Sequence, residues 1–156
     1  GWEVNTSCHI GRKFYERERK RMLFVLGDWR LRTDPAENAR GNVLYRCTCQ
    51  SCRNFLAVVE TLSGETRDFF RRLGLDIRCP TEALHRRPPG PDGRCEYRVW
   101  YDFPGELTQV PADRAPYPAA PGLRVAFLRR MPPMVGDVQM DAFFHLPFVL
   151  DEPWED

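Results

Sequence analysis

The chain has 156 residues, the length of one typical domain, and 42% of them are hydrophobic and 12% aromatic. This composition excludes an intrinsically disordered protein. The formal net charge is +1, so the overall charge gives no reason to expect a nucleic acid or a membrane surface as the partner. No apolar run approaches the roughly 18 residues of a membrane-spanning helix, and no signal peptide is visible.

The first segment with a marked pattern is residues 12–21, which are dense in charge and contain only two apolar side chains, Phe14 and Tyr15. Such a segment is typical of a solvated helix or of a solvated strand edge. The alternative is a basic patch that binds an anionic partner such as nucleic acid.

The next part of the chain predicts two strand regions with a loop between them. Residues 22–26 form a continuous apolar run, which predicts a buried strand that Trp29 and Leu31 extend. Turn-forming residues predict a loop over residues 33–42. Residues 43–49 alternate between two faces, which predicts another strand.

Two helices are predicted in the middle of the chain. After Cys49, apolar residues recur at helical spacing, which predicts a helix over about residues 50–61. Ser63 or Thr66 can cap the start of a second helix, and Gly74 stands where the glycine at a helix C-terminus is expected.

The second half of the chain is dominated by strands. They are predicted at residues 81–84, 95–103, 123–128 and 139–145, and the proline-rich residues 111–122 predict a surface loop. Strands that are joined by turns predict an α+β fold, in which an antiparallel sheet carries a short mid-chain layer of two helices on one face. We expect a single domain over residues 1–156.

The same patterns predict which side chains form the core. The predicted core residues are Leu23, Val25, Leu44, Phe55, Val59, Phe69, Leu73, Val99, Tyr101, Phe127 and Phe144.

Cysteine is the residue type that points most clearly to chemistry. Six cysteines occur, and Cys47, Cys49 and Cys52 lie within six positions. Crowding of this kind fits metal binding or thiol chemistry at least as well as a disulfide framework, so we expect reduced cysteines and a cytoplasmic protein.

Cys49 and Cys52 bracket the predicted strand-to-helix junction, a spacing that allows two thiolates to reach one zinc ion, and Cys47 can supply a third. A fourth ligand has to come from a distant part of the chain. The candidates for it are Cys8, His9, Cys79, His85 and Cys95.

Two alternatives use the same residues. In a thiol-disulfide oxidoreductase, Cys49 at the helix N-terminus is the nucleophile and Cys52 resolves the mixed disulfide. The order of the other elements does not match such an enzyme. In the other alternative, Cys47, Cys49 and Cys52 are small buried residues that pack the junction and carry no chemistry.

No recognisable catalytic set accompanies the cysteines. The sequence contains no nucleophile elbow, no phosphate-binding loop and no glycine-rich dinucleotide fingerprint, and its three histidines are more typical of isolated polar residues. We therefore predict no catalytic residue.

The last ten residues, 147–156, combine apolar and acidic side chains. We expect this tail to pack its apolar residues on the domain. The alternative is a contact surface for a partner.

Five separated segments of the chain share a pattern: residues 45–57 (YRCTCQSCRNFLA), the Leu-Gly-Leu-Asp turn at 73–76, the Pro-x-Glu at 80–82, the Tyr-rich strand at 97–101 and the closing Leu-Pro-Phe-Val-Leu at 146–150. In these segments the chain resembles a family of small uncharacterised bacterial proteins. The resemblance implies a single bacterial domain and implies no catalytic residue. The lack of a catalytic set beside an aromatic-rich sheet leads us to expect a non-enzymatic interaction protein, of adaptor or immunity type, with a protein partner and no membrane partner.

Overall fold

The computed structural model describes residues 20–44, 47–130 and 137–155, and for residues 82–86 it describes the backbone alone. The described elements, in chain order, are β1 (Met22–Leu26), β2 (Trp29–Thr33), α2 (Pro35–Arg40), α3 (Gln50–Val59), α4 (Gly64–Leu73), β3 (Glu82–Arg86), β4 (Arg94–Phe103), β5 (Glu106–Gln109), β6 (Tyr117–Ala120), β7 (Leu123–Arg129) and β8 (Val138–Pro147).

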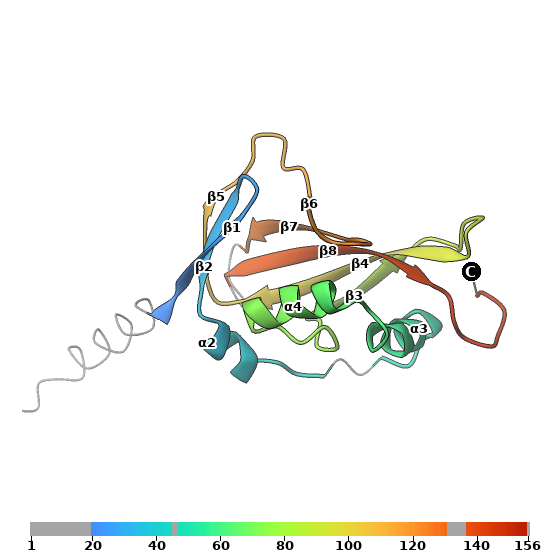
Figure 1. Cartoon of the computed structure of the whole chain (residues 1–156). Coiled ribbons are helices and arrows are strands. Elements are labelled where there is room, and N and C mark those ends of the chain that lie inside the picture. Colours follow the sequence, from blue (N-terminus) through green and yellow to red (C-terminus); the bar gives the residue numbers. More distant parts are fainter. Residues whose placement is uncertain (1–19, 45–46, 131–136, 156) are drawn as a thin grey trace, which may run out of the picture.

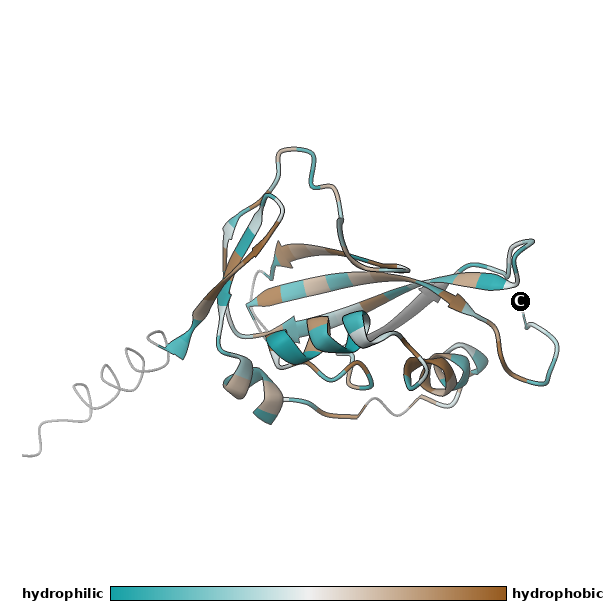
Figure 2. Ribbon diagram, viewed as in Figure 1, coloured by the Kyte–Doolittle hydropathy of each residue, from teal (hydrophilic) through white to brown (hydrophobic). Residues whose placement is uncertain are grey.

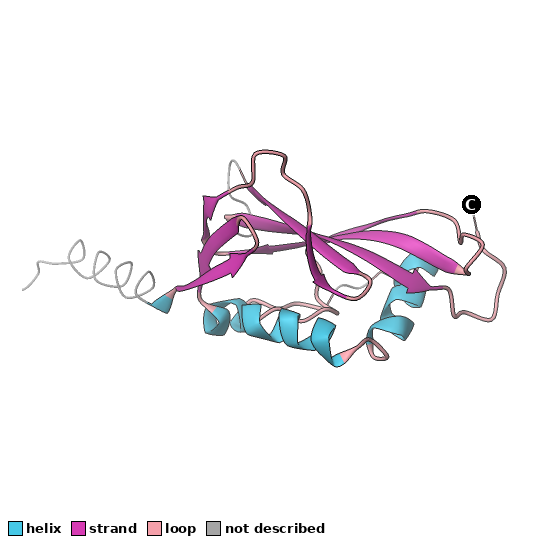
Figure 3. Cartoon of the chain, turned by 45° about the horizontal axis from the view of Figure 1, so that its top comes forward, coloured by secondary structure: helices cyan, strands magenta, loops and turns pink. Residues whose placement is uncertain are grey.

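The strands form two antiparallel sheets, with the orders β1-β2-β5 and β3-β4-β8-β7-β6. Helices α3 and α4 lie along one face of the larger sheet, and the smaller sheet stands at one end of it (Figures 1 and 3). The predicted α+β class is confirmed, although the strands divide between two sheets. No described helix is long and apolar enough to cross a membrane.

The ladder between β4 and β8 runs through the middle of the larger sheet. It begins with Arg94 opposite Pro147 and ends with Phe103 opposite Val138. Burial alternates along β4, because every second side chain points toward the helices and the others point away. This strand is the one whose alternation is clearest in the sequence, and the prediction is confirmed.

Aromatic side chains join the helices to this ladder. The ring of Phe55 on α3 lies 5.6 Å from that of Phe144 on β8, and the ring of Phe70 on α4 lies 5.1 Å from that of Tyr101 on β4, both edge to face. Both helices therefore bury their apolar sides against the same sheet face. The buried cluster also includes Trp29 of the smaller sheet.

Eight of the predicted core residues are buried: Phe55, Val59, Phe69, Leu73, Val99, Tyr101, Phe127 and Phe144.

Capping residues within the local sequence determine where α4 begins and ends. Ser63 Oγ accepts a hydrogen bond from the backbone N–H of Thr66 (3.3 Å), which caps the first turn as predicted. Gly74 ends the helix at φ 73°, in the left-handed region that favours glycine. An added Cβ at Gly74 would lie 2.0 Å from the carbonyl oxygen of Pro35, so glycine is also required for the close approach of α2.

The prediction of a buried strand at residues 22–26 is half wrong. The strand exists, but Met22, Leu23 and Val25 are 56%, 52% and 53% exposed. The reason is that β1 is an edge strand of the smaller sheet, where none of the described helices covers the apolar run. Figure 2 shows β1 as a largely hydrophobic ribbon at this edge.

The strand predicted at residues 43–49 is wrong for the part that the structure describes. Residues 43, 44, 47 and 48 are loop, and Val43 and Leu44 are 75% and 55% exposed. An alternating pattern forms a strand only where a neighbouring strand accepts its hydrogen bonds, and the described sheets offer none here.

Other differences concern short elements. Helix α2 occupies part of the predicted loop, because Asp34 and Pro35, which suggested a turn, also form a helix start: Asp34 Oδ1 accepts from the N–H of Ala36 (3.1 Å). Strand β6 lies within the predicted proline-rich loop, and β5 was not predicted. Most of the charged segment 12–21 lies outside the described residues.

Replacing Phe55 by alanine tests the helix-to-sheet packing. Because this side chain is 2% exposed and contacts Phe144, we expect Phe55→Ala to lower the free energy of unfolding by about 3–5 kcal/mol. Chemical denaturation measures this. A loss below about 1 kcal/mol, within the range of an ordinary surface substitution, would show that the α3 face is wrongly assigned.

Replacing Gly74 by alanine tests the approach of α2 to the end of α4. A left-handed residue other than glycine costs about 1–2 kcal/mol, and the contact with Pro35 adds to this loss. Gly93→Ala is the matched control, because Gly93 has φ 72° and nothing within 4 Å of an added Cβ. Equal losses of unfolding free energy in the two variants would contradict the close approach.

Candidate metal centre

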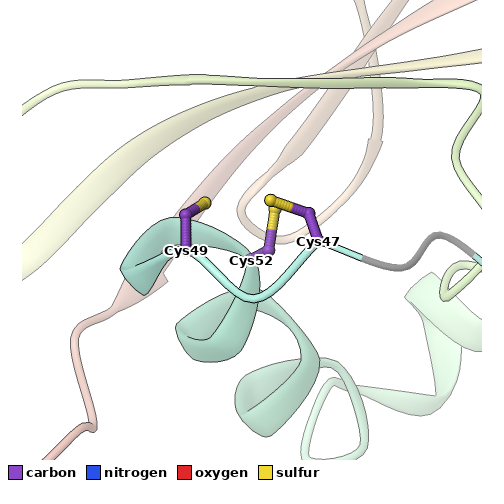
Figure 4. A group of neighbouring side chains, drawn as sticks. All are labelled: Cys47, Cys49 and Cys52. Carbon is purple, nitrogen blue, oxygen red and sulfur yellow. The ribbon is translucent and has the colours of Figure 1, made fainter.

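Cys47, Cys49 and Cys52 come together at the N-terminus of α3. Cys47 lies in the loop before the helix, Cys49 is the N-cap residue and Cys52 lies in the first turn. Their sulfur atoms all lie within 4.8 Å of one another, and Figure 4 shows the three side chains rising from the loop and the first turn toward the same side. The predicted convergence of these three thiols is present in the structure.

The loop conformation produces this convergence, and strand geometry does not. On a strand, Cys47 and Cys49 would project from one face about 7 Å apart along the chain. Here the chain curls before it enters α3, which brings the two sulfur atoms closer together.

The three thiols differ in exposure. Cys52 is buried, Cys47 is half-buried and Cys49 is exposed. The interpretation of all three as buried packing residues is therefore wrong for Cys49. An exposed thiol beside a buried one gives the cluster a side that solvent or a ligand can reach.

Electrostatics also separates Cys49 from Cys52. Partial burial of Cys49 disfavours its charged form, but the nearby backbone N–H groups of Cys52 and Ser51 and the neighbouring thiols of Cys47 and Cys52 stabilise the thiolate, and the net effect lowers the pKa of Cys49. Burial, together with hydrogen bonds to the Cys47 and Cys49 sulfurs and repulsion by their charge, raises the pKa of Cys52. Of Cys49 and Cys52, Cys49 is therefore the thiol that ionises first.

Hydrogen bonds and an ion pair attach the C-terminal tail, residues 148–155, to the N-terminal part of α3, next to the cysteine cluster. Gln50 Nε2 donates to the carbonyl oxygen of Pro153 (2.7 Å), and Gln50 Oε1 accepts from the N–H of Glu155 (2.8 Å). Arg53 Nη2 forms an ion pair with Glu152 Oε1 (2.8 Å), while its Nε donates to the carbonyl oxygen of Thr48 between the cysteines (3.0 Å). The tail and the cysteine loop therefore share Arg53.

Asn54 fixes the other end of this tail. Its Nδ2 donates to Tyr97 Oη (2.8 Å) and to the carbonyl oxygen of Pro147 (3.1 Å), and its Oδ1 accepts from the N–H of Val149 (2.8 Å). On either side of Val149, the rings of Phe148 and Trp154 pack edge to face at 5.7 Å and lie against the core. The expectation that the tail packs its apolar residues on the domain holds for Phe148 and Trp154, whereas Val149 is 52% exposed.

Sequence reasoning missed Gln50, Arg53 and Asn54. The available signal was a pair of polar residues four positions apart, Gln50 and Asn54, on the apolar side of a predicted helix. Buried polar residues at such positions need hydrogen-bond partners, which here come from the tail.

Among the described residues, none of the proposed fourth ligands joins the cluster. Cys79 lies in the turn after α4, and Cys95 is buried on β4. The other candidates, Cys8, His9 and the side chain of His85, lie outside what the structure describes. His145, the remaining histidine, is engaged elsewhere, since its ring nitrogens contact Glu96 (2.8 Å) and Asp92 (2.9 Å).

The residues fit a thiophilic metal in their chemistry. Zinc–sulfur bonds of about 2.3 Å in a tetrahedral site place the sulfur atoms about 3.8 Å apart, so the three sulfurs need to close by about 1 Å at most. Side-chain rotation of the exposed Cys49 can supply such a movement. The described residues therefore supply three thiol ligands, and the fourth position of a tetrahedral zinc site has no ligand among them.

Comparisons with known proteins add no family or relative to this geometry. A scan against models of protein families and searches of curated proteins and of solved structures gave no match to the chain. The resemblance to uncharacterised bacterial proteins stays a prediction.

Proposed function

We propose that this chain is a non-enzymatic bacterial interaction protein of the cytoplasm, of adaptor or immunity type, in which Cys47, Cys49 and Cys52 hold a structural zinc ion. The observation that carries the proposal is the convergence of three sulfur atoms within 4.8 Å of one another. Thiolate is a preferred ligand of zinc, and three of them supply most of a four-coordinate shell.

The charges in the cluster support a bound cation. Three thiols this close cannot all ionise without repulsion, which is one reason for the raised pKa of the buried Cys52. A dication removes that repulsion and favours the thiolate form of all three. Because protons compete with the metal for the sulfurs, zinc affinity should fall as the pH is lowered.

A metal here would act on more than the loop. Arg53 links the carbonyl oxygen of Thr48, between two of the ligands, to Glu152 on the tail. Fixing the loop therefore also fixes the tail, and binding energy at the cluster becomes folding energy for both segments.

The proposed interaction role is supported by exposed apolar residues on the smaller sheet. Met22, Leu23 and Val25 are all more than half exposed on β1, an edge strand of the sheets that the structure describes. An apolar edge strand is a template for contact with another chain. The residues of the charged segment that would bind nucleic acid lie mostly outside the described part, so that role stays a prediction.

Metal analysis of the untagged protein tests the zinc site. We expect one zinc per chain in the wild type, and loss of the metal in Cys47→Ser and Cys52→Ser because each removes one of three thiolates. Cys79→Ser is the matched control, since Cys79 is a thiol outside the cluster. A chelator should lower the melting temperature of the wild type and of Cys79→Ser, and should leave Cys47→Ser unchanged.

Two results would contradict the zinc site. One is wild-type protein that takes up no zinc when zinc is supplied under reducing conditions. The other is the same zinc content in Cys47→Ser and in the control.

A second function is favoured by one specific observation, the pairing of an exposed, acidic thiol at Cys49 with a buried, protonated thiol at Cys52. In thiol-disulfide exchange, the Cys49 thiolate attacks a substrate disulfide and releases one substrate thiolate, which takes up a proton. The Cys52 thiol, after losing its proton, then attacks the Cys49 sulfur of the mixed disulfide and releases the second substrate thiolate. A Cys49–Cys52 disulfide remains, and a thiol reductant returns it to two thiols.

The pH dependence of Cys49 alkylation in the metal-free protein tests this second function. If the pKa of Cys49 is lowered, its alkylation rate reaches half of its maximum below about pH 8.5, the usual pKa of a cysteine. Peptide mapping by mass spectrometry gives the rate for Cys49 alone. An ordinary titration near pH 8.5, or no reduction of a model disulfide, would exclude the exchange reaction.

A further inference from the structure

The edge of the smaller sheet at β1 differs from the other sheet edges that the structure describes. β1 pairs with β2 in an unbroken register, from Met22 opposite Thr33 to Leu26 opposite Trp29. The pairs that hold the other edge strands, β5, β3 and β6, each contain a register shift. Bulges are one means by which proteins prevent an edge strand from pairing with another chain, and β1 lacks them.

The other protective features of edge strands are also missing from β1. Its five residues, MLFVL, include no charged residue and no proline, whereas β6 contains Pro118 and β3 contains charged residues. On β5, the carbonyl oxygen of Leu107 already accepts a hydrogen bond from Arg129 Nη2. Leu23 and Val25 are 52% and 53% exposed, so the apolar surface of β1 is open to contact.

The geometry of the β1–β2 hairpin determines which backbone groups of β1 face away from β2. Gly27, with φ 60°, and Asp28 form a two-residue turn, and the residues that flank such a turn are a hydrogen-bonded pair, here Leu26 with its partner on β2. Because hydrogen-bonded pairs alternate along an antiparallel ladder, the N–H and C=O groups of Leu23 and Val25 face outward. A further strand can therefore pair with β1 through these two residues.

A second copy of β1 meets this requirement in an antiparallel arrangement centred on Phe24. Leu23 of each copy then lies opposite Val25 of the other, and both pairs are of the hydrogen-bonded kind. The two Phe24 side chains meet on the two-fold axis, at a pair of the type in which side chains approach most closely. Met22 lies opposite Leu26, so every residue of β1 faces an apolar residue of the second copy.

The charges that flank β1 favour this direction of pairing. Lys20 precedes β1 by two residues and Asp28 follows it by two, and both residues are exposed. In the antiparallel arrangement, Lys20 of each copy comes to the end of the interface that holds Asp28 of the other copy. A parallel arrangement would bring Lys20 to Lys20 and Asp28 to Asp28. Opposite charges across paired strands stabilise the pairing, and like charges destabilise it.

We propose that β1 is a homodimer interface, in which two copies of the chain pair antiparallel through Leu23 and Val25 and join their smaller sheets into one. The inference rests on the proposed interaction role and names a second copy of this chain as the partner. It does not involve the cysteine cluster. Two five-residue strands make a small contact, so we expect a dimer that dissociates on dilution.

Sedimentation velocity of the untagged protein at a series of concentrations, under reducing conditions, measures the dissociation constant of the dimer. Leu23→Glu should raise this constant about tenfold or more, because its apolar contact with Val25 is lost twice in a two-fold dimer. The introduced carboxylate lies beside Arg32 on β2, so the variant should fold. Val43→Glu is the matched control, because Val43 is an exposed apolar residue outside β1.

Val25→Lys tests the register of the interface. Alone, it should also weaken the dimer, since it places a charge opposite Leu23 of the second copy. In an equimolar mixture with Leu23→Glu, the proposed register sets the introduced carboxylate of one chain opposite the introduced ammonium of the other. We expect tighter association in the mixture than in either variant alone. No gain in the mixture would contradict the pairing of Leu23 with Val25.

Hydrogen exchange measured by mass spectrometry locates the interface on the backbone. Peptides that cover residues 22–26 should exchange more slowly at wild-type concentrations that favour the dimer, and this protection should be absent in Leu23→Glu. A dimer without such protection, or equal dissociation constants for Leu23→Glu and Val43→Glu, would overturn the assignment to β1. A wild type that stays monomeric at all concentrations would overturn the homodimer and leave residues 1–19 or a different protein as the partner of β1.

The zinc content of the same samples separates this inference from the proposed metal site. Leu23→Glu and the wild type should hold equal amounts of zinc, because β1 contains none of the three cysteines. A monomeric wild type that binds zinc would contradict the homodimer alone, and a dimer without zinc would contradict the metal site alone.

Discussion

The hydrogen bonds of Asn54 are the interaction on which the rest of this structure depends. The side chain is fully buried on α3, and it contacts β4 through Tyr97, the end of β8 through Pro147 and the tail through Val149. An amide can satisfy these partners only in one orientation, because the carbonyl oxygen of Pro147 must receive a proton and the N–H of Val149 must give one. A single residue therefore fixes the position of α3 against the sheet and the path of the tail away from it.

The cysteine cluster follows from that placement. Once the first turn of α3 is fixed, Cys52 is buried in it, and Cys49, as the N-cap residue, is left at the surface near the backbone N–H groups of that turn. The loop that carries Cys47 is tied to the tail through Arg53. The same contacts explain why the thiols differ in acidity, and why a metal ion bound to them would stabilise both the loop and the tail.

Local signals allowed parts of this structure to be predicted from the sequence. The cap at Ser63 and the left-handed Gly74 lie within one helix, and the alternation of β4 lies within one strand, so neighbouring residues carry enough information. The hydrophobic periodicity of the sequence could not show that β1 is an edge strand or that no described strand lies beside residues 43 and 44, because both facts depend on residues far away in the chain. The cysteines were predicted to meet from their spacing alone. Their attachment to the tail joins residues about a hundred positions apart and left almost no trace in the local pattern.

The most direct test of the central claim is X-ray absorption spectroscopy at the zinc edge of the untagged 156-residue chain, purified under reducing conditions with zinc present. Three cysteine ligands predict a first shell with three sulfur scatterers at about 2.3 Å and one further ligand. A first shell of nitrogen or oxygen alone, or zinc present far below one ion per chain, would contradict the account.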